Sequence, residues 1–325
     1  MNTYLNQWLT IIEQMNNDNT YKLAWGRALL ECIHSIVYSA NEQNLVVIDF
    51  HDIAKCMVKY YWNQSFFFNL KQSANQKKPP VIWQETVKLI NEYKEISKSS
   101  IPVWHDEGLS LILSHNPGLY LQCIERVVKT LHENVCWRFK NIQGNVLEIY
   151  IYDKQLGSYV FFKTEDIQIL KDYNVVIAKL LNYKWAQLLE KFNFAPKIVN
   201  KVNGISDSKI RRNNLTKYKE ILLMQFKDGE ILDFYTETPL DIHDISVDHV
   251  IPWSFMYSDD IWNLVLTSKS HNSSKSNSIP SEEIISKLKE RNRNLLSILD
   301  GKFKEDLEIA IEHGYLDKFY YECKL

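Results

Sequence analysis

Residues 246–280 constrain the chain more tightly than any other stretch. They read SVDHVIPWSFMYSDDIWNLVLTSKSHNSSKSNSIP, with an Asp-His pair at Asp248 and His249 in front of an apolar run. Asn263 follows His249 by 14 positions, and a second His-containing pair, His-Asn, begins eight positions after Asn263. Neighbouring side chains on a regular strand point to opposite faces. A strand alone therefore cannot aim Asp248 and His249 at one atom.

Charge changes sign in blocks around this stretch. Residues 204–219 contain five basic side chains and one acidic side chain, whereas residues 233–260 contain seven acidic side chains and no Lys or Arg. A basic block followed by an acidic block suits a metal-dependent nuclease, because cationic side chains bind a phosphate backbone and carboxylates bind a metal ion. Two solvated surfaces would give the same pattern. Charge alone leaves both interpretations open.

The pattern VDHVIP, followed by WNLVLTSKSHNSSKS, resembles the HNH (ββα-metal) endonuclease motif. In that motif an Asp-His pair on a strand is followed by an Asn-containing turn and by a ligand at the start of a short helix. The resemblance covers roughly residues 228–296 and includes IPSEE and a Lys-rich helix, as in the HNH domain of RNA-guided CRISPR effector nucleases. The chain is too short for such an effector, and no Arg-rich bridge helix or second nuclease motif is found. Its N-terminal part loosely resembles bacterial restriction and defence-type HNH proteins.

The resemblance implies roles for four residues. His249 would be the general base, a task that suits an imidazole titrating near neutral pH. Asp248 and Asn272 would be the metal ligands, and one carboxylate plus one amide oxygen, completed by water and phosphate, suits Mg²⁺ or Mn²⁺. Asn263 would tie the loop between the strands through its amide and so hold the base in position.

The resemblance also bears on a structural metal. His271 stands where many family members place a zinc-binding Cys; it is either a third ligand or a residue near DNA or solvent, and the second reading is favoured. LLMQFKDGEILDF and VLTSKSHN contain no Cys, so no structural zinc is expected. The candidates for hydrophobic packing in its place are Leu232, Phe234, Val265 and Leu266.

Basic side chains are the candidates for contacts with nucleic acid. Lys275 lies three positions after Asn272 and either contacts phosphate or faces solvent. The formal net charge of −2 provides no global basic field, so any such binding must be local. The other candidates are Lys209, Arg211 and Arg212 before the motif and Lys287, Lys289, Arg291 and Arg293 on the helix after it. The expected partner is DNA, double-stranded in the first instance, with RNA not excluded.

Three regions are expected in an α+β fold. Residues 1–133 form a mainly helical domain for targeting or regulation, residues 134–203 a β-hairpin plus a helix, and residues 204–325 the ββα-metal nuclease domain with its core motif at 245–280. The hairpin would join LEIYIYD to SYVFFKT, with Gly157 in its turn. LVVIDF is a short strand or an extended lead into a helix. KYYWNQSFFFNL is either core, the favoured reading, or a base-stacking platform.

Five scattered cysteines, no signal-peptide pattern and no run of about 18 apolar residues indicate a cytoplasmic protein without a membrane partner. Two functions follow. The first is a metal-dependent DNA endonuclease or nickase in restriction or anti-phage defence. The second is a non-cleaving nucleic-acid-binding or regulatory protein on an HNH scaffold. A single centre cuts one strand per visit, so a double-strand break would need a homodimer or sequential nicks. A partner protein from a defence system is a further possibility.

Overall fold

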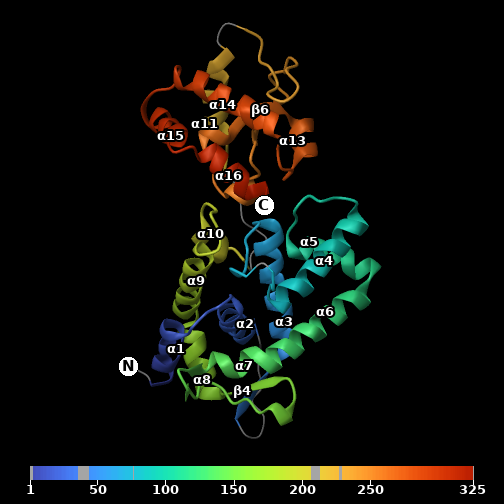
Figure 1. The fold of residues 1–325 in the computed structure, drawn as a ribbon, viewed down its shortest axis with the longest axis vertical. Helices are drawn as coiled ribbons and strands as arrows, with labels where there is room; N and C mark the ends of the chain where they lie inside the picture. Colours follow the sequence, from blue (N-terminus) through green and yellow to red (C-terminus); the bar gives the residue numbers. More distant parts are fainter. Residues whose placement is uncertain (1–2, 36–43, 76, 206–212, 227–228, 325) are drawn as a thin grey trace. The chain divides into compact units, whose positions relative to one another are not determined.

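The computed structural model describes residues 3–35, 44–75, 77–205, 213–226 and 229–324. Helices make up most of the chain, and the described residues also form three two-stranded sheets (Figure 1). This confirms the expected α+β class. The chain divides into two compact units. The first comprises Met1–Ser99, Val103–Asn193 and Ile198–Ser208, and the second comprises Ser100–Pro102, Phe194–Lys197 and Lys209–Leu325.

The first unit is mainly helical, as expected for its N-terminal part. Local capping explains where some helices begin: the Asp49 carboxylate accepts a hydrogen bond from the His51 amide at the start of α3, and Asn116 caps α6. The helices are α1 (Thr3–Gln14), α2 (Tyr21–Ser35), α3 (Phe50–Trp62), α4 (Val81–Ser97), α5 (His105–His115), α6 (Pro117–Thr130), α7 (Cys136–Phe139), α8 (Thr164–Asp172), α9 (Asn174–Glu190) and α10 (Ile198–Asn203). Two π-helical turns, η1 (Asn63–Phe67) and η2 (Leu131–Val135), and the 3₁₀ turn η3 (Lys154–Leu156) join them.

The strands of the first unit confirm the expected hairpin at one bridge and correct its main pairing. β4 (Tyr159–Lys163) pairs antiparallel with β1 (Leu45–Asp49), while the LEIYIYD segment contributes only an isolated bridge from Ile151 to β4. Alternate residues on both strands are buried and lie opposite each other, so the pair has one apolar face. The regions expected at 1–133 and 134–203 therefore share a sheet and lie in one unit. β2 (Asn141–Ile142) and β3 (Asn145–Val146) form a separate short ladder.

The aromatic run KYYWNQSFFFNL is core, which confirms the favoured reading. Tyr60, Tyr61 and Trp62 are fully buried, and the three phenylalanines that follow are at most 8% exposed. Trp62 donates a hydrogen bond from Nε1 to the Val103 carbonyl at 2.9 Å, and its ring packs directly beneath Gly108 on α5. These rings are unavailable as a stacking platform for bases.

The second unit is built around a short antiparallel pair of strands. β5 (Ile245–His249) and β6 (Leu264–Ser268) pair with Asp248 opposite Val265 and His249 opposite Leu264. The helices are α11 (Thr216–Leu223), α12 (Trp253–Met256), α13 (Lys269–Lys275), α14 (Glu282–Leu296), α15 (Gly301–Glu312) and α16 (Tyr315–Lys324), with 3₁₀ turns η4 (Met224–Phe226) and η5 (Ile261–Asn263). The order β5, β6, α13 is the strand, strand and helix arrangement that the sequence predicts.

Hydrophobic side chains from both strands and from the helices form one core in this unit. Val265 and Leu266 are 2% and 3% exposed, and Phe234 packs against the same cluster. Leu232 differs from the expectation: it is 37% exposed and lines a surface pocket. Three of the four side chains named as the packing core therefore belong to it.

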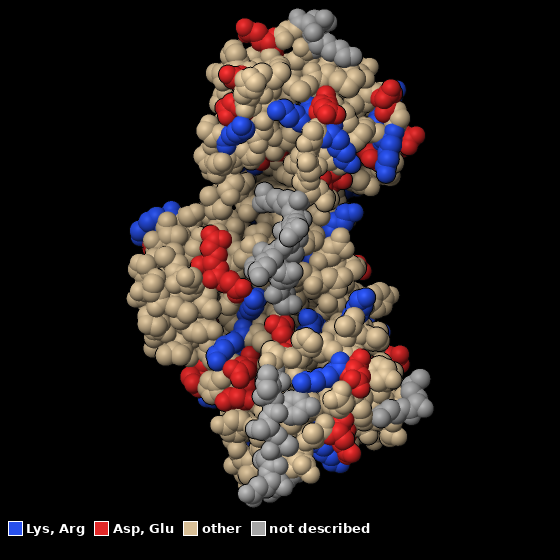
Figure 2. Space-filling view, turned by 180° about the vertical axis from the view of Figure 1, so that it is seen from behind, with Lys and Arg blue, Asp and Glu red and all other residues tan. Residues whose placement is uncertain are grey.

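No helix in the described part of the chain is long and apolar enough to cross a bilayer. On the face drawn in Figure 2, basic and acidic side chains are interspersed, without a field of one sign. This agrees with the small net charge of the sequence.

Substitution of Gly108 tests the packing of the first unit. A Cβ at this position would lie 2.3 Å from Cζ2 of Trp62, so Gly108→Ala must displace a fully buried ring. We expect it to lower the free energy of unfolding by about 1–3 kcal/mol. Gly118→Ala is the matched control on the next helix, where the nearest atom is 3.9 Å away. Chemical denaturation should show the loss only for Gly108→Ala; equal stability of the two variants would contradict this packing.

Candidate active site

One polar pocket in the second unit brings together the residues that the motif singles out. Asp248, His249 and Asn272 line a pocket of about 250 Å³. Asp248 and His249 are the last two residues of β5, and both line the pocket although neighbouring side chains on a regular strand point to opposite faces. The remaining lining residues are Trp253, Ser273, Ser276 and Asn277. A carboxylate, an imidazole and an amide thus share one pocket.

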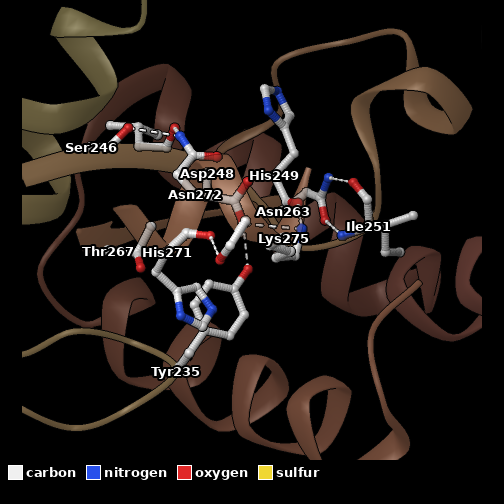
Figure 3. A network of polar contacts seen from close by, with 12 residues as sticks. Tyr235, Ser246, Asp248, His249, Ile251, Asn263, Thr267, His271, Asn272 and Lys275 are labelled. Atoms are coloured by element: carbon white, nitrogen blue, oxygen red, sulfur yellow. Dashed lines mark hydrogen bonds and ion pairs between the residues drawn. The ribbon is translucent and has the colours of Figure 1, made fainter. Parts of the chain in front are cut away.

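Asn263 forms hydrogen bonds to the backbone next to this pocket. Its amide nitrogen donates to the Ile251 carbonyl at 2.9 Å, and its amide oxygen accepts from the Ile251 amide at 2.8 Å (Figure 3). The Asn263 carbonyl also accepts from the Val250 amide at 2.9 Å. Asn263 is fully buried, so these bonds are shielded from water. They fix the two residues that follow His249.

Asn272 reaches the pocket from α13. Its amide nitrogen donates to Ser246 Oγ at 2.7 Å and more weakly to the Val247 carbonyl at 3.3 Å (Figure 3). These bonds fix the orientation of the amide. Within the described part of the chain no group donates to its oxygen. That oxygen is therefore available to a ligand.

Asp259 forms a buried pair with His249 that the sequence did not predict. Its Oδ1 lies 2.8 Å from His249 Nε2, and both side chains are at most 7% exposed. The Asp259 carbonyl accepts from the Tyr218 hydroxyl at 2.6 Å, which ties the loop to α11. A water molecule to be deprotonated by His249 must therefore meet Nδ1 or displace Asp259. The SDD sequence contains Asp259, but the spacing between Asp259 and His249 along the chain does not indicate that the two side chains meet.

Two further side chains contact the Asp248 carboxylate. Lys275 Nζ lies 3.1 Å from Asp248 Oδ2 and donates to the His249 carbonyl at 2.8 Å. The Tyr235 hydroxyl donates to the same Oδ2 (Figure 3). Burial, reinforced by the neighbouring Asp248 carboxylate, raises the pKa of Tyr235, so the hydroxyl keeps its proton. Tyr235 was not a sequence candidate, because it lies outside the spaced motif.

The donor set suits a hard divalent cation. Asp248 keeps Oδ1 and Asn272 keeps its amide oxygen without a partner among the described residues, and both are oxygen donors of the kind that Mg²⁺ prefers. Across those same residues, no group of three or more His, Cys, Asp or Glu is arranged to hold a metal ion. Protein ligands alone would thus provide two positions. The Lys275 ammonium already supplies positive charge at Asp248 and would compete with a cation there.

The acidic block at residues 233–260 does not form one acidic pocket. Asp233 accepts from Thr267 Oγ1 at 2.7 Å and from backbone amides, and Glu237 pairs with Lys287 at 2.6 Å. Asp259 pairs with His249, as described above. Only Asp248 from this block lines the pocket.

The remaining residues proposed to bind metal or nucleic acid do not gather at the pocket. His271 does not line the pocket; its ring stacks on Tyr235 with centroids 4.6 Å apart. Lys275 is 9% exposed, so its ammonium faces Asp248 and not solvent. Lys289 pairs with Asp317 at 2.5 Å, Arg291 has a buried Nε and Arg293 is exposed. Lys209, Arg211 and Arg212 lie outside the described residues.

Comparison with known proteins identifies the family of the segment that forms the pocket. Residues 233–281 match the family model described as HNH endonuclease. The chain carries an HNH endonuclease domain. This confirms the resemblance found in the sequence, and the match includes Asp248, His249, Asn263 and Asn272.

Two curated relatives of the HNH domain are CRISPR-associated endonucleases. The chain is 38% identical over 87 residues to the CRISPR-associated endonuclease Cas9 of Listeria innocua, and 35% identical over 111 residues to that of Streptococcus mutans. The matches cover 26% and 32% of this chain but only 6% and 8% of the relatives. The chain therefore spans less than a tenth of the length of these relatives. No solved structure matches it significantly.

The Asn263 bonds lead to a stability prediction. Asn263→Ala leaves the Ile251 amide and carbonyl buried without partners, so we expect a loss of about 2–4 kcal/mol in the free energy of unfolding. Asn272→Ala removes an amide that is partly exposed and should cost about 0.5–1.5 kcal/mol. Urea denaturation of the two variants measures the difference. A smaller loss for Asn263→Ala than for Asn272→Ala would refute the structural role given to Asn263.

Proposed function

We propose that this protein is a metal-dependent HNH endonuclease or nickase that hydrolyses phosphodiester bonds in DNA, with double-stranded DNA as the first candidate substrate and RNA as a further one. The observation that carries the proposal is the convergence of Asp248, His249 and Asn272 on one polar pocket. They lie in the segment that matches the HNH endonuclease family. Hydrolysis needs a base for the attacking water and a cation for the charge on phosphate, and these side chains meet both needs.

Each residue has a distinct task in the proposed reaction. His249 accepts the proton of the attacking water, and Asp259 orients the imidazole. Asp248 and Asn272 would hold Mg²⁺ or Mn²⁺, which when bound neutralises charge on the scissile phosphate. Asn263 supports catalysis by fixing the backbone that follows His249.

Substrate contacts outside the pocket are also part of the proposal. Lys275 would contact phosphate either with the third donor of its ammonium or after this group leaves the Asp248 carboxylate. Lys209, Arg211 and Arg212 would bind backbone phosphates without reading sequence. Single-strand cleavage follows from one centre per chain, and double-strand cleavage would require a homodimer or two visits.

The relatives support a proposal for the biological setting. Because both relatives described above are CRISPR-associated, anti-phage defence is favoured over restriction. A cytoplasmic location and a defence-system partner fit this setting. The first unit would then serve target choice or regulation.

A second candidate function is a non-cleaving nucleic-acid-binding or regulatory scaffold. The observation in its favour is that both reactive side chains already have partners: Asp248 pairs with Lys275, and His249 pairs with Asp259. A nuclease has to bring a metal ion to an Asp248 carboxylate that Lys275 already contacts and has to present water to Nδ1 of His249, whereas a scaffold needs neither.

Cleavage of supercoiled plasmid separates the two functions. With Mg²⁺ or Mn²⁺ we expect wild-type protein to produce nicked circles and His249→Ala to be slower by about 100-fold to 10,000-fold, because the base is lost. His271→Ala is the matched control, since His271 does not line the pocket, and it should retain most activity. Gel electrophoresis over time measures all three.

The same assay defines failure of the nuclease proposal. It should be repeated with single-stranded DNA, RNA and modified DNA. If wild type and His249→Ala leave every substrate equally intact, the scaffold function is the better account. Equal loss of activity in both histidine variants would contradict the assignment of His249 as the base.

Metal binding gives a prediction that does not depend on turnover. Asp248→Asn removes the charged ligand, so we expect Mn²⁺ affinity to fall by about tenfold or more. Lys275→Met removes the ammonium that competes for this carboxylate and should increase affinity. Lys269→Met, an exposed lysine on the same helix, is the control and should change nothing. Isothermal titration calorimetry measures the three variants; unchanged affinity in Asp248→Asn would exclude Asp248 as a ligand.

A further inference from the structure

The HNH domain has a second, larger pocket that shares no lining residue with the first. It measures about 540 Å³, within the range of pockets that hold small organic molecules. Its apolar wall is formed by Leu232, Phe234, Val265, Leu266 and Ile298. Leu232 and Ile298 are 37% and 36% exposed, so apolar surface is open to an occupant.

Arg291 on α14 lines this pocket without an ion pair in the described part of the chain. Its Nε is buried and has no hydrogen-bond partner there, and each terminal nitrogen lies 3.5 Å from the Ile261 carbonyl, a weak contact. Burial lowers the pKa of Arg291 to about 9, so the side chain is still a cation at neutral pH. A buried cation without a counter-charge is unfavourable.

The other charged residues of the pocket do not supply this counter-charge. Glu237 pairs with Lys287 at 2.6 Å. Asp233 is engaged by the Thr267 hydroxyl and by backbone amides, and Glu290 is exposed to solvent. Arg291 therefore remains the cation in this pocket with most to gain from an anionic ligand.

We propose that this pocket binds a small organic anion, with a carboxylate or phosphate group on the Arg291 guanidinium and an apolar body against Leu232 and Ile298. A planar guanidinium binds either group through two hydrogen bonds. The apolar wall disfavours a nucleic-acid backbone, whose surface is polar and charged. The site is separate from the proposed cleavage centre and does not depend on nuclease activity.

The probes are octanoate, octyl phosphate, octylammonium and octanol, which share one chain and differ in their head groups. Calorimetry in metal-free buffer without DNA should detect binding of one or both anions at one site per chain, and much weaker binding of octylammonium and octanol. Which of the anions binds more tightly identifies the preferred head group. Equal binding of all four probes, or none by either anion, overturns the proposal.

Arg291→Met tests the assigned cation. We expect the affinity for the preferred anion to fall by about tenfold to hundredfold, because a charged hydrogen-bonded contact is lost. Lys302→Met, an exposed lysine on α15, is the control for loss of one positive charge and should bind like wild type. A folded Arg291→Met variant that binds the anion as wild type does would refute the assignment.

Ile298→Asp provides an independent variant in case Arg291→Met does not fold. Ile298 lines the pocket and is 36% exposed, so the change is compatible with folding. An added carboxylate on the wall should weaken anion binding by about tenfold or more, through repulsion and competition for Arg291. Unchanged anion binding in Ile298→Asp places the probe elsewhere and overturns the proposal.

Discussion

The two hydrogen bonds between the Asn263 amide and the backbone of Ile251 are the contact on which the site depends. They join the segment after β5 to the segment before β6, so they close the loop that separates the two strands. Because Asn263 is fully buried, the bonds do not compete with water. The strand pairing then fixes Asp248 and His249, and β6 leads directly into α13 with Asn272. A buried side-chain amide and a hydrophobic core together organise this domain.

Other side chains already contact both reactive groups of the pocket. Lys275 holds Asp248, and Asp259 holds His249, each within 3.1 Å. Buried charges are costly without partners, so these pairs stabilise the pocket. The Lys275 pair opposes cation binding at Asp248, whereas the Asp259 pair orients the imidazole and leaves Nδ1 for the attacking water. Stability and the proposed activity therefore compete at the Asp248 carboxylate, where a metal ion would displace Lys275 from Oδ2 or bind Oδ1 beside it.

Much of the domain can be predicted from the sequence, because the spacing of its motif residues along the chain indicates their arrangement. The Asp-His pair, the two asparagines and the strand, strand and helix order follow from the motif, and buried aromatic residues follow from composition. Tyr235 and Asp259 were missed, since a hydrogen bond between distant segments leaves no periodic signal. The expected hairpin is reduced to one bridge, between Ile151 and Phe161, for a related reason: alternation marks β4 as a strand but does not identify β1 as its main partner. Leu232 was misplaced because hydrophobicity alone does not distinguish a core from a pocket wall.

The pairing of β1 with β4 has a consequence for synthesis of the chain. Leu45 lies opposite Lys163, so more than a hundred residues must be made before the first strand meets its partner. Until then β1 presents an unpaired edge with alternate apolar residues, which is a site for wrong associations. Closure of such a long loop is also slow. The sheet of the first unit is therefore expected to form only after β4 has left the ribosome, with the helices α2 and α3 shielding β1 in the interval.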